Sequence, residues 1–200
     1  MDWLDFLHIA DSSFPTGAYA HSGGLEALQP ADLRTALELR VRCSLATFEL
    51  VFVRAAYNHD LAELDERYHA TCLPRELREA SMAIGASLAR AAADVGFHTP
   101  PMPHKHYAVV FGALACVVHA QVDVALQAFA FSTLRGHVSA AQKLGWLGQR
   151  EAQRVLHALK PLVRQAVQTE LPLEHAGAFV PLWDIASMQH EQAHTRLFMS

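Results

Sequence analysis

The chain has 200 residues, a length that suits one domain with a substantial core. Hydrophobic residues make up 52% of it and charged residues 18%, so the surplus of apolar side chains must be buried in a large core or against a partner protein. The formal net charge is −4 and no run of Lys or Arg stands out. This argues against a nucleic-acid-binding protein, because such proteins gain most of their affinity from cations on phosphates.

Cysteine usage and the lack of a targeting signal indicate a cytoplasmic protein. The three cysteines, Cys43, Cys72 and Cys116, are far apart and odd in number, which is typical of reduced thiols. Asp2 and Asp5 occupy the place where a signal peptide carries basic residues. The most apolar stretch, 107–134, is interrupted by polar residues, so we expect it to form a buried helical hairpin and no membrane span.

The first half of the chain predicts helices separated by proline and glycine. A long helix is expected over 30–58, because its apolar residues follow three- and four-residue steps. A shorter helix follows over 61–71. The next is expected over 74–95, with Pro74 in its first turn and Gly96 as its C-terminal stop.

The second half continues in the same way and no segment alternates with period two. After the 107–134 hairpin, a break is expected at Gly136, followed by a helix over 151–169 that Pro161 should kink or interrupt. The fold class is therefore all-α: a single compact bundle of about seven or eight helices over 1–170. A linker over 171–181 and a short helical tail segment over 184–198 complete the chain.

The tail contains the zinc-hydrolase pattern H-E-x-x-H at His190, Glu191 and His194. Two histidines four residues apart on a helix can hold one zinc ion while the glutamate acts on its bound water. Only six residues follow His194, however, so no third ligand can lie downstream. We expect the polar face of a short helix, and keep a zinc hydrolase as an alternative.

The segment His104-Lys105-His106 is a candidate nickel or zinc clip, because imidazole binds both metals well. No carboxylate or cysteine lies nearby in sequence to complete a site. We therefore expect solvated loop histidines here, and keep a direct nickel carrier as an alternative.

The most unusual local sequence is the glycine-rich stretch 11–26. Its three glycines allow the backbone to approach another surface closely. It is not a phosphate-binding Walker loop, because no G-K-[ST] follows the glycines, and Ala20 precludes a G-x-S-x-G nucleophile elbow.

This stretch resembles the first signature of the UreF family of urease accessory proteins, D-S-x-x-P-x-G-x-[FY]-x-x-S-x-G-L-E. Later segments resemble the family too, at 76–85, 111–112, 140–153 and 184–200. One departure is Lys143, which stands where the family pattern has arginine. The first signature, that of the glycine-rich stretch, is matched by Asp11, Ser12, Pro15, Gly17, Tyr19, Ser22, Gly24, Leu25 and Glu26.

The resemblance implies an all-α homodimer that scaffolds nickel delivery to apo-urease, without catalytic activity, cofactor or metal site of its own. Its implied partners are the accessory protein UreD (UreH in some systems), the nickel-carrying GTPase UreG, whose activity it would modulate, and apo-urease itself.

The resemblance also implies two partner-binding segments: the glycine-rich loop and the C-terminal tail. A short apolar tail helix is too short to be stable alone and gains order in a groove. Whether that groove belongs to a partner or to the chain's own bundle stays open. The implied contact residues are Ala18, Tyr19, Ala20, His21 and Ser22 in the loop, and His190, Arg196, Leu197, Phe198 and Ser200 in the tail.

Overall fold

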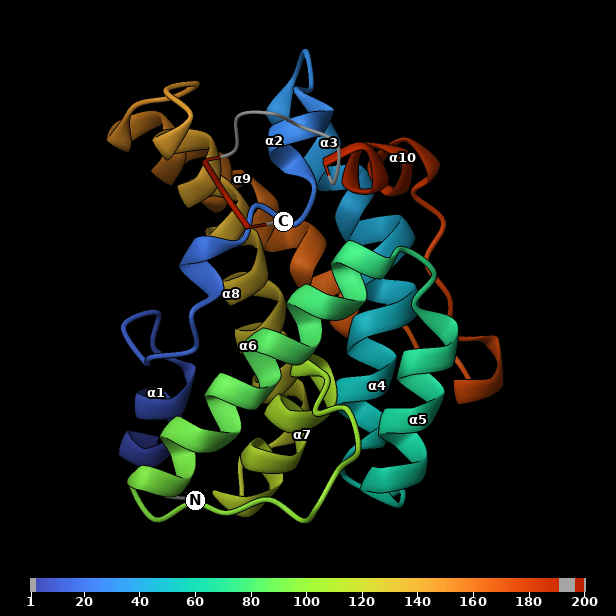
Figure 1. Cartoon of the computed structure of the whole chain (residues 1–200). Coiled ribbons are helices and arrows are strands. Elements are labelled where there is room, and N and C mark those ends of the chain that lie inside the picture. Colours follow the sequence, from blue (N-terminus) through green and yellow to red (C-terminus); the bar gives the residue numbers. More distant parts are fainter. Residues whose placement is uncertain (1–2, 191–196, 200) are drawn as a thin grey trace.

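The computed structural model describes residues 3–190 and 197–199, with His190 represented by its backbone alone. Within these ranges the chain forms the helices α1 to α10 and no β-strand, which confirms the all-α prediction (Figure 1). The expected count of seven or eight is slightly low. Two short helices, α1 (Trp3–Ala10) and α2 (Leu25–Leu28), account for part of the difference.

The predicted helix over 30–58 is a continuous helical rod with a change of winding in its middle. It consists of α3 (Leu33–Arg40), the π-helix η2 (Val41–Glu49) and α4 (Leu50–Ala55). The Asp32 side chain caps its start by accepting from the backbone N–H groups of Arg34 and Thr35.

Helices α5 (Leu61–Thr71) and α6 (Arg75–Asp94) match their predicted bounds to within one residue. Asp60 caps α5 through its side chain. Gly85 lets α6 pass against the loop before α7, because a Cβ there would lie 1.9 Å from the Lys105 carbonyl oxygen.

The hairpin of α7 (Tyr107–Val117) and α8 (Val122–Lys143) lies in the core, as predicted. The predicted break at Gly136 is wrong, since α8 runs through this position. A glycine inside a helix costs only about 1 kcal/mol, and the buried side chains of Leu134 and Val138 on either side hold the helix in place.

Helix α9 (Gln149–Val167) packs along α8 and continues through Pro161 without interruption. The segment that follows contains the short 3-10 helix η3 (Leu173–His175) and is tied to the π-helix. The backbone N–H groups of Gly177 and Phe179 donate to the carbonyls of Thr47 and Cys43, at 2.9 and 2.8 Å.

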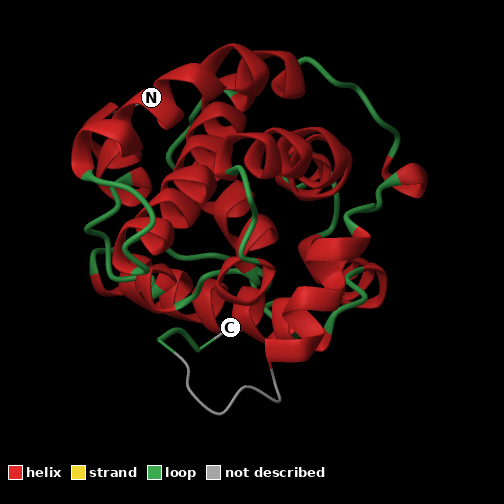
Figure 2. Ribbon diagram, turned by 90° about the horizontal axis from the view of Figure 1, so that it is seen from above, coloured by secondary structure: helices red, strands yellow, loops and turns green. Residues whose placement is uncertain are grey.

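The last helix, α10 (Pro181–His190), packs on α2 and touches α6. Beyond it, residues 197–199 are not helical. Figure 2 shows helices and loops throughout the described part of the molecule. None of the described helices is long and apolar enough to cross a membrane.

Candidate partner-binding surface

The glycine-rich loop presents Tyr19 to solvent. Gly17 adopts a left-handed conformation, with φ of 73°, and the chain then makes one 3-10 turn, η1 (Ala18–Ala20). This turn directs the Tyr19 side chain outward, where it is 74% exposed. Other large apolar side chains, such as Leu73 and Phe179, are as exposed, but a tyrosine is the residue type that binding surfaces favour.

The end of the chain lies directly on this loop (Figure 1). The backbone N–H of Met199 donates to the Ala20 carbonyl at 2.8 Å. The Glu26 carboxylate accepts from the backbone N–H groups of Leu197 and Phe198, at 2.9 and 3.2 Å. The Phe198 side chain is buried, at 5% exposure, so residues 197–199 pack on the chain's own bundle.

Lys143, at the end of α8, joins the two segments. Its ammonium donates to the Tyr19 carbonyl at 2.9 Å. The same nitrogen lies 5.3 Å from the ring centroid of Tyr19 and 5.5 Å from that of Phe198, within the range of cation–π attraction.

Three apolar side chains project from this arrangement into solvent: Tyr19, Leu197 (61% exposed) and Met199 (71% exposed). These three residues and the residues that hold them in place are called the loop–tail surface. It comprises Ala18, Tyr19, Ala20, Glu26, Lys143, Leu197, Phe198 and Met199.

The other two loop residues of interest lie beneath this surface. Ser22 is fully buried, and its carbonyl oxygen lies 3.1 Å from Nδ1 of His137. Burial lowers the pKa of His137 to about 3. His21 is half-buried, and burial lowers its pKa as well. His21 and Ser22 therefore support the loop from its buried side.

Trp183 fixes α10 against the same loop. Its indole N–H donates to the Gly23 carbonyl, and its ring lies beneath the Arg40 guanidinium, 5.6 Å from the centroid. Gly24, with φ of 87°, lies so close that an added Cβ would stand 3.1 Å from the indole and 3.3 Å from Cβ of Ser187. Helix α10 can thus pack this closely on the loop only because position 24 is a glycine.

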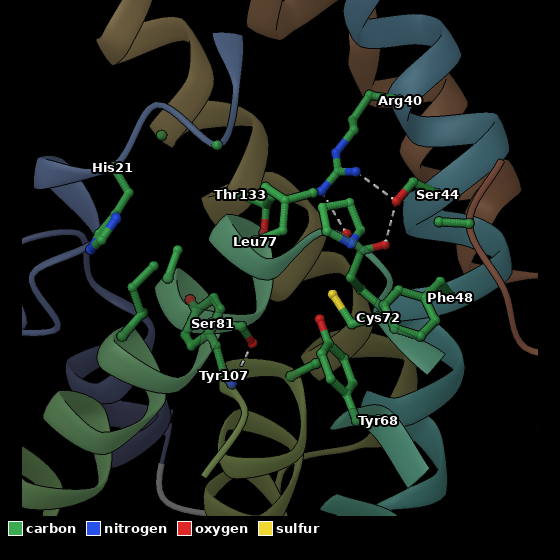
Figure 3. Close-up of a pocket in the computed structure, with 18 of the residues that line it drawn as sticks. His21, Arg40, Ser44, Phe48, Tyr68, Cys72, Leu77, Ser81, Tyr107 and Thr133 are labelled. Carbon is green, nitrogen blue, oxygen red and sulfur yellow. Dashed lines mark hydrogen bonds and ion pairs between the residues drawn. The ribbon is translucent and has the colours of Figure 1, made fainter. Parts of the chain in front are cut away.

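Below the loop lies a central cavity of about 160 Å³. In Figure 3, His21 faces it from one side and Arg40 with Ser44 from the other, while Tyr68 and Cys72 close its floor. Burial raises the pKa of the Cys72 thiol to about 12, so this thiol stays protonated and is a poor nucleophile or metal ligand at neutral pH. The lining is mostly apolar, with the Arg40–Glu49 ion pair at its edge.

The expectation of solvated histidines at 104–106 is wrong for His106, which is fully buried. The reason is Asp65, whose buried carboxylate accepts from three consecutive backbone N–H groups at 2.6 to 2.8 Å and pulls the segment inward. Both ring nitrogens of His106 are engaged, with His69 and with Ser81, each at 3.2 Å.

His104 lies nearer the surface and contacts residues that are distant from it in sequence. Its ring stacks on His69 with centroids 3.8 Å apart, and its Nε2 lies 3.1 Å from a Glu66 oxygen. Among the described residues, no group of three His, Cys, Asp or Glu side chains is arranged to hold a metal ion.

The remaining predicted contact residues lie outside the described part of the chain. These are Arg196, Ser200 and the side chain of His190, together with Glu191 and His194 of the H-E-x-x-H pattern. The predicted helix over 184–198 is correct in its described first half only, as far as His190.

Known proteins match the chain over nearly its whole length. A family model described as UreF matches residues 28–160. Three similar proteins are named urease accessory protein UreF. That of Actinobacillus pleuropneumoniae serotype 3 (strain JL03) is 31% identical over 97% of both chains. That of Picosynechococcus sp. (strain ATCC 27264 / PCC 7002 / PR-6) is 30% identical over 100% of both. That of Bacillus sp. (strain TB-90) is 28% identical over 98% of both. With two thirds of its length inside the family model and relatives at 30% identity or more, the chain belongs to the UreF family of urease accessory proteins.

Proposed function

We propose that this protein is a non-catalytic adaptor for nickel delivery to urease, and that the loop–tail surface is where it binds its partners. It acts in the cytoplasm as a homodimer that joins a UreD-type (UreH-type) accessory protein, recruits the UreG-type GTPase and modulates it, and docks on apo-urease. Residues 1–170 form the helical body, and residues 171–200 supply the linker, α10 and the tail.

The observation that supports this proposal most is that two segments distant in sequence are hydrogen-bonded into one surface with exposed apolar side chains. Leu197 and Phe198 are bonded to Glu26, 171 and 172 residues earlier in the chain. Fixing these segments in advance reduces the entropy lost on binding, which is how preorganised surfaces gain affinity.

The composition of the surface also fits a protein partner. Tyr19, Leu197 and Met199 are exposed apolar side chains, and Lys143 adds a cation at their centre. Tyrosine and methionine are enriched in interfaces, and an aromatic anchor commonly carries much of the binding energy.

The alternative of a direct nickel carrier at His104 and His106 has less support. A histidine whose two ring nitrogens are both engaged, as in His106, must break buried contacts before it can bind a metal. The zinc-hydrolase alternative rests on residues outside the described ranges.

Co-purification tests the proposal. The wild-type chain is expected to retain the UreD-type protein and the GTPase, whereas Tyr19→Ala and deletion of residues 196–200 both abolish retention. Val117→Ala on α7 is the matched control, since Val117 is also an exposed apolar residue but lies outside the loop–tail surface. Full retention of both partners by the Tyr19 variant and the deletion variant, with intact helical content, would refute the assignment.

A further inference from the structure

Helix α9 carries a row of cations along its exposed face. At 100° per residue, these positions fall within an arc of about 120°. All of them are exposed. We call this set the basic stripe: Arg150, Arg154, Lys160 and Arg164, with His157 between them.

The spacing of the charges in the stripe lowers the stability of helix α9. Arg150 and Arg154, and again Lys160 and Arg164, are like-charged pairs four residues apart, a spacing at which like charges repel. Arg150 also lies in the first turn, where the helix dipole disfavours cations.

Elsewhere the chain uses the same spacing to stabilise its helices. Arg34 pairs with Glu38 on α3 at 2.8 Å, and Arg75 pairs with Glu79 on α6 at 2.7 Å. Within the ranges that the structure describes, no cation of the basic stripe has an acidic partner within 4 Å. Lys160 lies over the Phe131 ring, 5.9 Å from its centroid, but among the described residues the like-charged pairs of the stripe have no carboxylate that offsets their repulsion, which points to a partner.

The stripe also stands out against the charge of the whole protein. The chain carries a formal charge of −4, so without these four cations it would carry −8. Four of the chain's 16 Lys and Arg residues thus lie on one helix face of an acidic molecule, and such a local concentration of cations steers acidic partners toward that face.

A groove of about 470 Å³ adjoins the N-terminal end of the stripe. It runs between the start of α3 and the first turns of α9, and Arg154 belongs to both groove and stripe. Trp146, 37% exposed, supplies an aromatic wall, and Leu147 and Val155 add apolar surface. Asp32 and Glu151 also line the groove, and the Asp32 carboxylate is engaged in capping α3. The groove can therefore take an apolar side chain beside Arg34 and Arg154.

We propose that the basic stripe and this groove form a second docking surface, which binds an acidic amphipathic helix of a partner protein. A second copy of this chain is a poor occupant, because a two-fold interface would set the stripe against itself. Nucleic acid is disfavoured by the net negative charge of the molecule. The proposal is independent of the loop–tail surface.

Fluorescence anisotropy with two labelled helical peptides tests the proposal. One peptide has Glu on one face and Leu on the other, and its counterpart has Lys in place of Glu. The key variant is R150E/K160E, which turns both like-charged pairs into Glu–Arg pairs in the favourable order. Its matched control is R67E/R90E, which makes the same change of charge at exposed positions on α5 and α6.

The acidic peptide is expected to bind the wild type and the R67E/R90E control alike. It should bind R150E/K160E at least ten-fold more weakly, and Trp146→Ala should weaken it as well. The melting temperature of R150E/K160E should rise by about 2 to 4 °C, since the repulsion is removed. Lower affinity with higher stability excludes misfolding as the cause.

Three results would overturn the proposal: no binding of the acidic peptide to the wild type, equal binding to R150E/K160E, or equal binding of the lysine peptide. If R150E/K160E melts below the wild type, R150Q/K160Q replaces it, and the same loss of binding is required. A random-sequence DNA duplex that binds as tightly as the acidic peptide, and is lost in the same variant, would assign the stripe to nucleic acid instead.

Discussion

Arg40 and Glu49 form an ion pair at 2.7 Å although they are nine residues apart on one helical rod. Nine residues of α-helix make two and a half turns, which would place the two side chains on opposite faces. In a π-helix, with about 4.4 residues per turn, nine residues make about two turns and the side chains meet. The π-helix η2 is therefore what brings the pair together, and Ser44, one turn along, bridges it at 2.7 and 2.9 Å.

Loss of one partner of this pair should be costly, because both side chains are only 9% exposed. Glu49→Leu leaves the Arg40 cation buried and uncompensated and should lower the free energy of unfolding by about 3–5 kcal/mol. The double variant R40M/E49L removes both charges and should cost clearly less than the two single changes together. Urea denaturation of all four proteins measures the coupling. Additive losses would contradict a direct interaction between the two side chains.

The close packing of Trp183 on Gly24 predicts that replacing Gly24 and replacing Gly17, which has a similar backbone conformation, lower the free energy of unfolding by different amounts. Gly17→Ala introduces only backbone strain, of about 1–2 kcal/mol, because nothing lies within 4 Å of the added Cβ. Gly24→Ala carries the same strain and also pushes the new methyl group into Trp183 and Ser187. It should therefore cost at least about 1 kcal/mol more and displace α10. Denaturation curves, with tryptophan fluorescence as a second probe, compare the two variants. Equal losses of unfolding free energy in the two variants would mean that α10 moves away from the added methyl group without a loss of stability.

The sequence predicted what depends on local periodicity. The bounds of α6 followed from apolar spacing together with Pro74 and Gly96, which act within one turn of the helix ends. Those of α5 were predicted without use of its Asp60 cap. The π-helix could not be predicted in this way, because 41–49 has the same apolar stripe that an α-helix would have. Its carbonyls at Cys43 and Thr47 accept from backbone N–H groups in 177–179, at least 130 residues away.

The candidate site was predicted only in part, for the same reason. The glycines and Tyr19 marked the loop as unusual, but nothing near Lys143 or Glu26 in sequence indicates that they meet the tail. These contacts join residues more than 100 positions apart and appear only once the bundle has formed. The burial of His106 was missed because its cause, Asp65, lies on another helix.

Lys143 should control how firmly the tail is held. Lys143→Met keeps the length of the side chain but loses the hydrogen bond to the Tyr19 carbonyl and both cation–π contacts, each worth about 0.5–1 kcal/mol at an exposed site. The amide hydrogens of Phe198 and Met199 should then exchange about ten-fold faster. Lys143→Arg keeps the cation and should restore slow exchange.

Lys160→Met provides the matched control for this experiment, because Lys160 also lies over an aromatic ring, that of Phe131, at 5.9 Å. It is not part of the loop–tail surface, so exchange at the tail should not change. Unaltered exchange in Lys143→Met would show that the backbone bonds to Glu26 and Ala20 hold the tail without the cation.

The two buried histidines should make the protein less stable in mild acid. Burial lowers the pKa of His137 to about 3 and that of His106 to about 4, from an ordinary value of 6.5. Below pH 6.5 the unfolded chain therefore binds protons that the folded chain does not. The free energy of unfolding is highest above this pH and falls as the pH drops toward 4. Each histidine should cost about 2 kcal/mol between pH 7.5 and pH 5.

Comparison of variants isolates this effect from that of the carboxylates, which titrate in the same range. In His106→Gln and His137→Gln the loss of stability between pH 7.5 and pH 5 should shrink by about 2 kcal/mol each, whatever the stability at neutral pH. His157→Gln, an exposed position on α9, should leave the slope unchanged. Urea denaturation at several pH values measures all four slopes. If the slopes of the two buried-site variants match that of the wild type, the folded protein takes up protons at these sites as readily as the unfolded chain. The two imidazoles would then have to lie in contact with water.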